Sequence, residues 1–546
     1  MRNPAPSHAA SLLILAVVTA ACLLPFIGKA FHIDDPLFVW CARHIRSDPF
    51  NFYGFNVNWD GEDKPMAAVT QNPPLAAYYM ALVGFLLGWS EISLHLGFII
   101  PALAAVIGTY HLARHLCSRP LLAALGVVTA PVFLLSGSSL MCDTMMLAFW
   151  VWAVSFWIEG LKNESQGKLF VAALLVVACS MTKYFGACLI PLLAAYSLRE
   201  GRRIHSWLAY LLFAASALAF YQWLTQRLYG HGLLLNAMLY ATQLRVGGEL
   251  PSKILSGLAF VGGCMVVVVP AAPLLWKRNT LVLGLVAAAL VGILLVGMKS
   301  VGSFLVVEAE NIKWPFLIQM SVYVAAGLSV AWLAIQELQE GKTPGAALLA
   351  LWITGTFVFA CAVNWTISGR NILPMLPAVS ILLVRRLEMQ KLRHGWGSTL
   401  KTLAPFGISL TIAALATLAD CKLADSAKES ARLLTQRLGA TSSAIRFEGH
   451  WGFQYYMEEL GAKALDRQNL RLVPNEAIVV PSGNSYLFPL REDRVALWST
   501  YETTPSKWLT TMSGLAGAGY YSDGWGPLPF VFCSVPAERY LVYRVH

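Results

Sequence analysis

The sequence predicts an all-α polytopic membrane protein with about thirteen transmembrane helices and a long first external loop, followed by a small external α/β domain. Hydrophobic residues make up 57% of the 546 positions and charged residues only 13%, which lies outside the range of soluble chains of this length. Apolar runs long enough to cross a bilayer end at about residue 419, and the sequence then becomes ordinary and polar. We therefore expect a transmembrane body over residues 1–419 and a soluble domain over residues 420–546.

Thirteen segments have the length and apolar composition of a membrane span. They cover residues 10–31, 92–116, 120–137, 143–160, 168–182, 184–198, 206–225, 251–276, 279–298, 314–337, 344–363, 372–387 and 400–419. Because this number is odd, the two ends of the chain are expected on opposite sides of the membrane. A fourteenth apolar segment, residues 73–89, would change this arrangement if it also crossed the membrane.

The basic residues decide between these two arrangements through the positive-inside rule. If residues 73–89 lie flat in the membrane interface, four basic clusters between the spans fall on the same side, which the rule identifies as cytoplasmic. These clusters are residues 114–119, 199–203, 276–278 and 385–393. We therefore expect a multi-pass protein of the inner (plasma) membrane with a cytoplasmic N-terminus and a periplasmic or extracellular C-terminal domain.

The net charge of +10 at pH 7 would suggest a nucleic-acid partner in a soluble protein. Here the Lys and Arg residues gather in short loops between apolar runs, so membrane topology explains the charge and no nucleic-acid binding is expected. The ten cysteines show no metal-ligand spacing. Cys421 and Cys533, both in the C-terminal domain, are the two that could form a disulfide, and the sequence leaves this open.

The first external loop, residues 32–91, opens with the adjacent carboxylates of Asp34 and Asp35. It continues with a short helical stretch at 36–46 and an irregular acidic and aromatic patch at 58–65, before the flat helix. Two adjacent like charges repel, and neither is buried without a large desolvation cost. The pair is therefore harder to explain as a solvated helix cap than as part of a site.

Charged residues also gather at the external ends of separate spans. Asp143 opens the fourth span, Lys183 separates the fifth from the sixth, and Arg370 precedes the twelfth. Each has a structural explanation as well, because Asp143 could cap its helix and the two cations could extend to the membrane interface. The middles of the spans carry almost no ionisable residue, whereas an ion-coupled transporter keeps one near the bilayer midplane. The pattern favours an external site over a transport pathway.

Five motifs follow one another on the predicted external side. They are the acidic pair after the first span, Pro-Pro-Leu at 73–75, the acid at the head of the fourth span, Thr-Lys-Tyr at 182–184 and Gly-Arg-x-x-Leu-Pro-x-Leu-Pro at 369–377. This set resembles the GT-C superfamily of membrane glycosyltransferases, and in particular bacterial members similar to protein O-mannosyltransferases and the lipid A aminoarabinose transferase. The resemblance covers most of residues 10–390.

The resemblance implies a donor sugar carried on a polyprenyl phosphate in the membrane lipid, and its inverting transfer to an acceptor hydroxyl on a protein, a lipid or a glycan. It makes Asp34 the general base, Asp35 its neighbour in the site and Asp143 a second site carboxylate, while Lys183 and Arg370 hold the lipid phosphate. The chemistry requires a base at the incoming hydroxyl and cations at the leaving phosphate. One carboxyl of the adjacent pair is expected to have its pKa raised by the other.

One departure from the family pattern lies just before Pro-Pro-Leu. Relatives of the aminoarabinose transferase usually carry a charged pair there, whereas this chain has Gln71 and Asn72, so part of the usual phosphate or acceptor contact is missing or moved. Possible substrate contacts are therefore Gln71 and Asn72 themselves, His32, Lys64, Tyr184 and the external loop at 299–313.

No cofactor is expected to be required. Asp34, Asp35 and Asp143 could hold Mg²⁺ or Mn²⁺, as in the oligosaccharyltransferase branch of the superfamily, but Lys183 and Arg370 offer the same charge stabilisation. The alternative functions are a multi-span transporter or lipid-linked saccharide flippase without transferase activity, and a non-catalytic membrane assembly or sensor protein. The sequence leaves the sugar and the acceptor open.

The C-terminal domain alternates helical and strand-like segments, which predicts a small α/β fold. We expect an amphipathic helix at 422–438, a second helix at 451–461, strand-like segments at 443–447 and 477–482, and two further apolar runs at 529–535 and 539–545. The second helix carries four aromatic residues that could stack on sugar rings, although a role in the domain core is favoured. These residues are Trp451, Phe453, Tyr455 and Tyr456.

Overall fold

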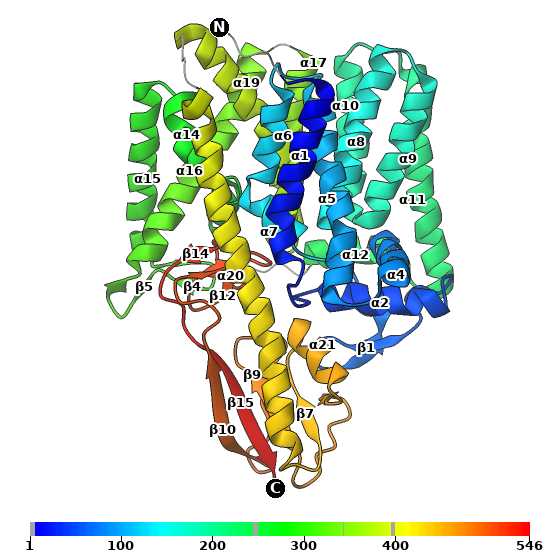
Figure 1. Cartoon of the computed structure of the whole chain (residues 1–546), viewed down its shortest axis with the longest axis vertical. Helices are drawn as coiled ribbons and strands as arrows, with labels where there is room; N and C mark the ends of the chain where they lie inside the picture. The colour runs from blue at the N-terminus through cyan, green and yellow to red at the C-terminus, as the bar shows by residue number, and fades with distance from the viewer. Residues whose placement is uncertain (1–5, 244–248, 342, 395–398) are drawn as a thin grey trace.

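The computed structural model describes residues 6–243, 249–341, 343–394 and 399–546. Its larger part is a bundle of long helices, and a smaller part rich in strands extends from one end of that bundle (Figure 1). The helices of the bundle are α1 (His8–Leu23), α5 (Glu91–Ala113), α6 (Pro120–Val128), α7 (Pro131–Gly137), α8 (Asp143–Lys162), α9 (Gln166–Thr182), α10 (Leu189–Arg199), α11 (Leu208–Tyr229), α13 (Leu250–Cys264), α14 (Val268–Leu275), α15 (Arg278–Met298), α16 (Trp314–Glu340), α17 (Pro344–Val358), α19 (Leu376–His394) and α20 (Thr399–Gly439).

Among the described residues, eight helices are long and apolar enough to cross a membrane, or up to ten if each of two bent pairs is one span. The bent pairs are α6 with α7, at 61°, and α13 with α14, at 84°. Each predicted span overlaps a helix or a bent pair of the bundle. The first ends at Phe26 rather than at residue 31, α9 and α10 are shorter apolar helices, and α19 ends in a charged segment. The multi-span helical body is confirmed, and the number thirteen stays a prediction.

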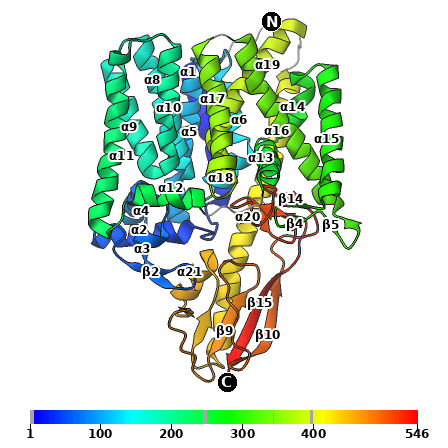
Figure 2. The same ribbon diagram turned by 180° about the vertical axis from the view of Figure 1, so that it is seen from behind.

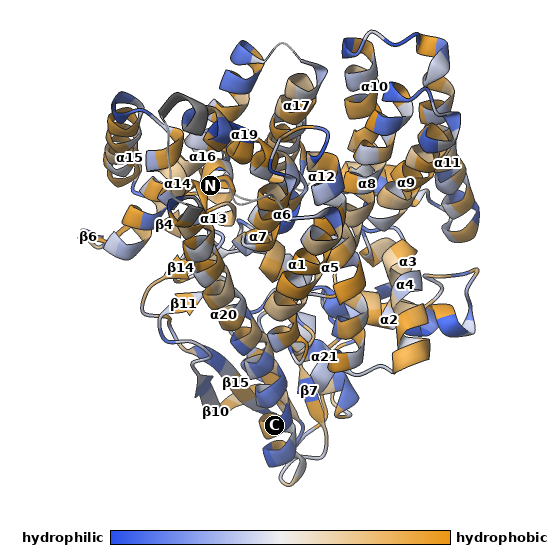
Figure 3. Cartoon of the chain, turned by 45° about the horizontal axis from the view of Figure 1, so that its top comes forward, coloured by the Kyte–Doolittle hydropathy of each residue, from blue (hydrophilic) through white to orange (hydrophobic). Residues whose placement is uncertain are grey.

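The outer surface of the bundle suits a lipid environment. Only 6% of the apolar window of α15 is buried inside the protein. An apolar helix exposed on nearly all sides needs a hydrocarbon solvent. Hydrophobic residues cover the helices of the bundle, while the distal half of α20 and the strands beyond it are more hydrophilic (Figure 3).

The short elements of the first loop gather at the end of the bundle from which the strand-rich part extends (Figure 2). They are α2 (Asp35–Ser47), β1 (Asn56–Asn58), β2 (Asp63–Pro65), α3 (Met66–Val69) and α4 (Leu75–Leu87). The helix expected at 36–46 is α2. Half of the patch at 58–65, expected to be irregular, lies in the paired strands of the antiparallel hairpin β1–β2, and residues 59–62 form the bend between them. Helix α4 has 13 residues and is about 20 Å long, too short to cross roughly 30 Å of hydrocarbon, which agrees with a non-spanning segment.

Two features near this end of the bundle were not expected from the sequence. Helix α12 (Leu233–Gln243) lies beside the elements of the first loop (Figure 2). The segment 299–313 folds into two small antiparallel hairpins, β3 (Ser300–Val301) with β4 (Phe304–Leu305) and β5 (Val307–Glu308) with β6 (Asn311–Ile312).

Helix α20 joins the two parts of the molecule. The sequence predicts two helices, 400–419 and 422–438, but the structure has one continuous helix of 41 residues. At 1.5 Å per residue this helix is about 60 Å long, twice the thickness of the hydrocarbon core. The predicted border between residues 419 and 420 thus falls inside α20, and the division into two domains stays a prediction.

The strand-rich part contains a five-stranded sheet with the order β10-β15-β9-β7-β8. The strands are β7 (Ile445–Phe447), β8 (Lys463–Ala464), β9 (Ala477–Pro481), β10 (Val495–Thr503) and β15 (Glu538–Val545). β7 pairs parallel with β8 and β9, while β15 pairs antiparallel with β9 and β10. Helix α21 (Trp451–Glu459) packs with α20. The sheet confirms the strand content of the predicted α/β domain, and β10 was not anticipated.

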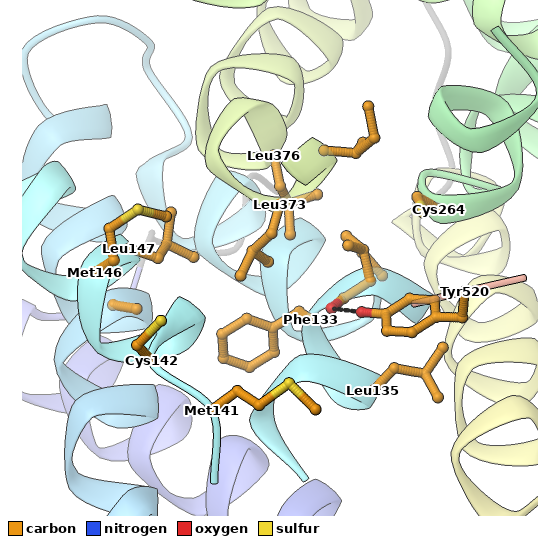
Figure 4. Packing of buried hydrophobic residues seen from close by; sticks show 14 of the residues in the cluster. Phe133, Leu135, Met141, Cys142, Met146, Leu147, Cys264, Leu373, Leu376 and Tyr520 are labelled. Atoms are coloured by element: carbon orange, nitrogen blue, oxygen red, sulfur yellow. Dashed lines mark hydrogen bonds between the residues drawn. The ribbon is translucent and has the colours of Figure 1, made fainter. Parts of the chain in front are cut away.

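The C-terminal segment before β15 returns to the bundle. It forms the short strands β11 (Leu509–Thr510), β12 (Met512–Ser513), β13 (Ala518–Gly519) and β14 (Val531–Phe532). The side chain of Tyr520 is buried among Phe133, Leu135 and other bundle residues (Figure 4), and its hydroxyl lies 2.7 Å from the Ser136 hydroxyl. Cys421 and Cys533 are both free thiols in the structure.

A buried acid in the sheet region should make folding depend on pH. Glu448 follows β7, and one of its oxygens accepts a hydrogen bond from the Phe488 amide at 3.1 Å. The other oxygen is buried and has no hydrogen-bond partner in the part of the chain that the structure describes. Burial raises the pKa of this carboxyl from 4.5 to about 7. Because the folded state favours the protonated form, the associated stability is complete below about pH 4.5 and is lost as the pH rises through about 7.

We expect Glu448→Gln to raise the midpoint of thermal unfolding at about pH 8 and to change it little at about pH 4, because the amide keeps the shape of the protonated acid without its charge. The pKa difference corresponds to roughly 3 kcal/mol at the higher pH. Fluorescence-detected unfolding of the protein in lipid nanodiscs measures both midpoints. Glu492→Gln, at an exposed acid of the same region, serves as the control. Equal midpoints for wild type and Glu448→Gln at the higher pH would contradict this account.

Candidate active site

Four charged side chains from distant parts of the sequence form one network, hereafter the charged network. The Arg370 guanidinium lies 2.9 Å from an oxygen of Asp34 and 3.9 Å from an oxygen of Asp143. Lys183 Nζ lies 2.6 Å from the other oxygen of Asp143. The charged network therefore runs in the order Asp34, Arg370, Asp143, Lys183, and it unites four residues that the sequence predicts for one site.

Each of these side chains is placed by the end of a helix. Asp34 is the N-cap residue of α2, Asp143 is the first residue of α8, and Lys183 follows the last residue of α9. Arg370 belongs to the short helix α18 (Gly369–Ile372). Helix ends are where the backbone changes direction, so charged side chains there reach a shared space without interrupting the apolar helices.

Two further contacts fix the position of Lys183. Its ammonium donates a hydrogen bond to the side-chain oxygen of Asn371 at 3.2 Å, which connects the end of α9 to α18. The turn after Lys183 folds back so closely that a Cβ on Gly186 would lie 2.5 Å from the carbonyl carbon of Cys179. Only glycine allows this approach. The resulting turn directs Lys183 toward Asp143.

The charged network is accessible and its hydrogen bonding is incomplete. The side chains of Asp34, Arg370 and Lys183 are 25%, 18% and 17% exposed, whereas Asp143 is buried. Asp143 Oδ2 and Arg370 Nε are buried without a hydrogen-bond partner among the described residues. Lys183 has three N–H donors and uses two. Buried polar groups without partners are rare, so this site has donors left for a ligand.

Asp35 occupies a different environment from its neighbour. Its side chain is fully buried, and its oxygens accept hydrogen bonds from the amides of His32 at 3.0 Å and Leu140 at 2.9 Å and from the Ser139 hydroxyl at 3.0 Å. Burial raises the pKa of Asp35 to about 6. From the sequence, repulsion between the two carboxylates was the expected cause of a raised pKa. In the structure the cause is desolvation of the Asp35 carboxyl. Asp35 thus ties the loop that carries Asp34 to the loop before α8.

Three other residues predicted to contact the substrate, Asn72, Gln71 and Tyr184, are not members of the charged network. The Asn72 side-chain oxygen accepts a hydrogen bond from Cys142 Sγ at 3.6 Å, next to Asp143 in the chain. An oxygen of the preceding residue, Gln71, is buried without a partner among the described residues. The hydroxyl of Tyr184 lies 3.1 Å from that of Tyr221.

Lys64 is not brought into the charged network. It lies in the β1–β2 hairpin, where its ammonium pairs with Asp60 and Glu62 at 2.9 Å each. The hairpins of segment 299–313 approach the C-terminal segment instead, since the Ser303 hydroxyl donates to the Gly524 carbonyl at 3.4 Å.

A second buried ion pair lies close by and was missed by the sequence reasoning. Lys29 Nζ lies 2.6 Å from Asp420 of α20, and both side chains are fully buried. The hydroxyls of Thr511 and Tyr521 donate to the same carboxylate at 2.6 and 2.7 Å. Two signals in the sequence could have revealed this pair, because Lys29 stands on the predicted external side, against the positive-inside rule, and Asp420 directly follows the last span.

This ion pair belongs to a series of anchors for the residues that lead to Asp34. After Lys29, the Ala30 amide donates to Asp425 at 3.0 Å and the Phe31 amide donates to the Tyr456 hydroxyl at 2.8 Å. The segment 29–31 is thus held by α20 and α21, and the His32 amide is held by Asp35. The strand-rich part of the molecule thereby helps to position the Asp34 carboxylate.

His32 connects the anchors to the charged network through an aromatic ring. Its imidazole meets the ring of Tyr521 edge to face at 5.4 Å between centroids, and the Arg370 guanidinium lies 5.9 Å from the centroid of the same ring. Burial lowers the pKa of His32 to about 4, so the imidazole is neutral at physiological pH.

The carboxylates of the charged network are paired with cations of the chain itself. Within the described ranges, no group of three His, Cys, Asp or Glu side chains is placed to hold a metal ion. Asp34 and Asp143 each face Arg370 or Lys183, so cations of the chain itself occupy the space next to their oxygens. Mg²⁺ and Ca²⁺ need several oxygen ligands around one point.

Comparison with known proteins gives one match in sequence. The sequence model of a family described as dolichyl-phosphate-mannose-protein mannosyltransferase matches residues 71–225, less than a third of the chain. This range includes Asp143 and Lys183 of the charged network, and it confirms the predicted resemblance over that part. No curated protein matches the chain.

Several solved structures have a similar backbone fold. ArnT from Cupriavidus metallidurans, bound to undecaprenyl phosphate, is 13% identical with a TM-score of 0.45, over 87% of this chain and 93% of that one. The Archaeoglobus fulgidus oligosaccharyltransferase, tethered to an acceptor peptide, is 11% identical with a TM-score of 0.48, over 84% of this chain and 63% of that one. The arabinofuranosyltransferase AftD from Mycobacteria is 12% identical with a TM-score of 0.41, over 98% of this chain and 40% of that one. Similarities at this level say nothing about the substrates of this chain.

The Lys29–Asp420 pair offers a test of the anchoring. We expect Asp420→Asn to lower the free energy of unfolding by about 3 kcal/mol, because it leaves the Lys29 charge buried without a counterion. Removing both charges in Lys29→Met with Asp420→Leu should cost less than either single change, since no charge is then left uncompensated. Thermal unfolding in nanodiscs measures Asp420→Asn, the single changes Lys29→Met and Asp420→Leu, and the double variant. Additive losses in the double variant would contradict a buried pair.

Proposed function

We propose that this chain is a membrane glycosyltransferase that moves a sugar from a polyprenyl-phosphate donor to an acceptor hydroxyl, with inversion, at the periplasmic or external face of the inner membrane. The observation that carries the proposal is the charged network, in which two carboxylates and two cations from four helix ends meet within ion-pair distance. The match of residues 71–225 to a mannosyltransferase family supports the same reaction class.

Asp34 is the proposed general base. Its carboxylate is the more exposed of the two in the charged network, and the neighbouring Asp35 is occupied by three hydrogen bonds within the protein. In the reaction, the acceptor oxygen forms a bond to the anomeric carbon, and its proton passes to Asp34. A carboxylate within hydrogen-bond reach of the hydroxyl is the usual group for this task.

Lys183 and Arg370 are the proposed phosphate ligands. The bond between the anomeric carbon and the phosphate oxygen breaks, and its electron pair leaves with the lipid phosphate. The unpaired Nε of Arg370 and the remaining donor of Lys183 can bind that anion without breaking the ion pairs to Asp143. Stabilising charge where it develops is often the largest contribution to catalysis.

The order of the charged network suits an inverting displacement. Asp34 lies at one end of the series and Lys183 at the other, with Arg370 and Asp143 between them. In the proposed reaction the acceptor oxygen attacks from the Asp34 end, and the phosphate leaves toward Lys183 and the side of Arg370 that approaches Asp143. Such a single displacement inverts the anomeric configuration.

We expect Asp34→Asn to reduce sugar transfer by about 100-fold or more, because the amide cannot accept the proton of the acceptor hydroxyl. Asp493→Asn, which changes an exposed Asp of the strand-rich part, is the matched control and should keep normal transfer. Mass spectrometry of envelope glycans, glycolipids and glycoproteins from cells that carry each variant provides the readout and identifies the sugar. Normal transfer by Asp34→Asn would remove Asp34 from the role of base. If the wild-type protein transfers no sugar and Asp34→Asn instead stops a lipid-linked saccharide from crossing the membrane, the result would favour the flippase alternative.

Transfer should not depend on a divalent cation, because Lys183 and Arg370 already supply positive charge at the phosphate. We expect the rate of purified protein in nanodiscs to be unchanged after treatment with EDTA. A loss of transfer that added Mg²⁺ or Mn²⁺ restores would contradict this expectation and assign a metal role to the carboxylates.

A further inference from the structure

A cavity of about 650 Å³ lies next to the loop that carries Asp34. It is partly open, and three parts of the chain line it: the turn at His32 and Ile33, the side of α20 at Leu423 and Ala427, and residues of the strand-rich part. Its volume is in the range of sites for small molecules. The role proposed for the charged network does not use it.

Two tryptophans shape this cavity. Trp451, at the start of α21, and Trp525, in the C-terminal segment, both line it and are both half-buried. Their rings meet at 5.4 Å between centroids with an angle of 64°. Two rings at this angle present a flat face and an edge to a ligand, and the apolar faces of sugar rings pack well on such surfaces.

The cavity also offers polar groups that lack partners. His32 lines the cavity, and its Nε2 makes no hydrogen bond among the described residues, the nearest carboxylate oxygen being that of Asp420 at 3.9 Å. The carboxyl of Glu538 lies on the same lining, and no described residue pairs with it. Burial alone raises the pKa of Glu538 to about 7. A neutral imidazole and a carboxyl that changes protonation near pH 7 can both donate and accept hydrogen bonds.

The charge of the cavity separates it from the phosphate site. Arg539 is the one permanent cation among its lining residues, and its guanidinium already pairs with Glu502 at 2.8 Å. A phosphorylated group would therefore meet one cation that is already paired and, on the same lining, the carboxyl of Glu538, whereas the charged network offers two cations, Arg370 and Lys183. Aromatic faces with uncharged polar groups fit a neutral ligand rich in hydroxyls.

The wall of the cavity continues directly into the charged network. Ile33, which lines the cavity, precedes Asp34 and has a positive φ of 46°. A β-branched residue in this conformation is strained, and such strain persists where the surrounding structure holds a functional segment in place. The Tyr521 ring lies between His32 of the wall and Arg370.

We propose that this cavity is the acceptor site and that it binds a neutral saccharide, so that the acceptor hydroxyl is a sugar hydroxyl. The proposal rests on the proposed function for the identity of the reaction. Trp451 and Trp525 hold the sugar rings, His32 and Glu538 bind hydroxyls, and the Ile33 turn leads the reactive end toward Asp34.

Saturation-transfer NMR of the full chain in lipid nanodiscs tests the proposal without relying on catalysis. Nanodiscs avoid maltoside detergents, which would compete for the cavity. The probes are maltose, N,N′-diacetylchitobiose and mannobiose, with maltose 1-phosphate as the charged comparison. We expect saturation transfer to at least one neutral disaccharide, and binding of maltose 1-phosphate no tighter than that of maltose. Trp525→Ala should weaken the binding by about tenfold. Trp498→Ala, at an exposed tryptophan outside the cavity, should leave it unchanged.

The outcomes separate this proposal from the proposed function. No saturation transfer to any of the three disaccharides, or equal binding by wild type and Trp525→Ala, would overturn the saccharide site. Quenching of tryptophan fluorescence by brominated phospholipids that is smaller in Trp525→Phe than in the wild type would also overturn it, because the cavity would then hold an acyl chain. If the wild-type protein binds a disaccharide but transfers no sugar, the saccharide site stands and only the proposed transferase function is refuted.

Discussion

The candidate site depends on the ability of Arg370 to bridge two carboxylates that come from segments far apart in the sequence. Asp34 and Asp143 are separated by more than a hundred residues, and each would be costly to bury without a counterion. A guanidinium can satisfy both because it carries several donors in a fixed plane and stays charged at any physiological pH. Lys183 completes the charge balance at the far end. The result is a neutral assembly that still has unpaired donors, which is a suitable ground state for a site that receives a lipid phosphate.

A second constraint fixes the geometry of this assembly from outside the membrane body. The buried pair of Lys29 and Asp420 ties the chain before Asp34 to the middle of α20, and α21 holds the next residues. At the start of α21, a Cβ on Gly452 would lie 2.0 Å from the Phe31 carbonyl oxygen, so the helix rests directly on this loop. The strand-rich part therefore supports the loop that carries Asp34. The cavity lies where this loop, α20 and the strand-rich part meet.

The sequence predicted the helical body and the members of the charged network because both leave local signals. Spans are visible as long apolar runs, and Asp143, Lys183 and Arg370 are charged residues at span ends where apolar residues would be expected. The sequence could not show that Arg370 contacts both carboxylates, or that Asp35 faces away from Asp34 into a set of protein hydrogen bonds. Those facts depend on the packing of α2, α8 and α18, which no short segment encodes.

Other elements escaped prediction for definite physical reasons. α20 was read as two helices because its composition changes from apolar to amphipathic at the edge of the membrane, although its backbone continues without a break. The β1–β2 hairpin was hidden by its charged residues, and β10 by its mostly exposed side chains. The Lys29–Asp420 pair joins residues 391 positions apart, so each looked like an isolated charge at a span end.

The most direct test of the account is an experimental structure of the protein with a polyprenyl phosphate in nanodiscs. The account predicts density for the phosphate within hydrogen-bond reach of Arg370 Nε and Lys183 Nζ, with the Asp34 carboxylate facing the open side of the phosphorus. Phosphate bound elsewhere on the bundle, with the ion pairs of Arg370 to Asp34 and of Lys183 to Asp143 undisturbed, would contradict the assignment of this network as the donor site.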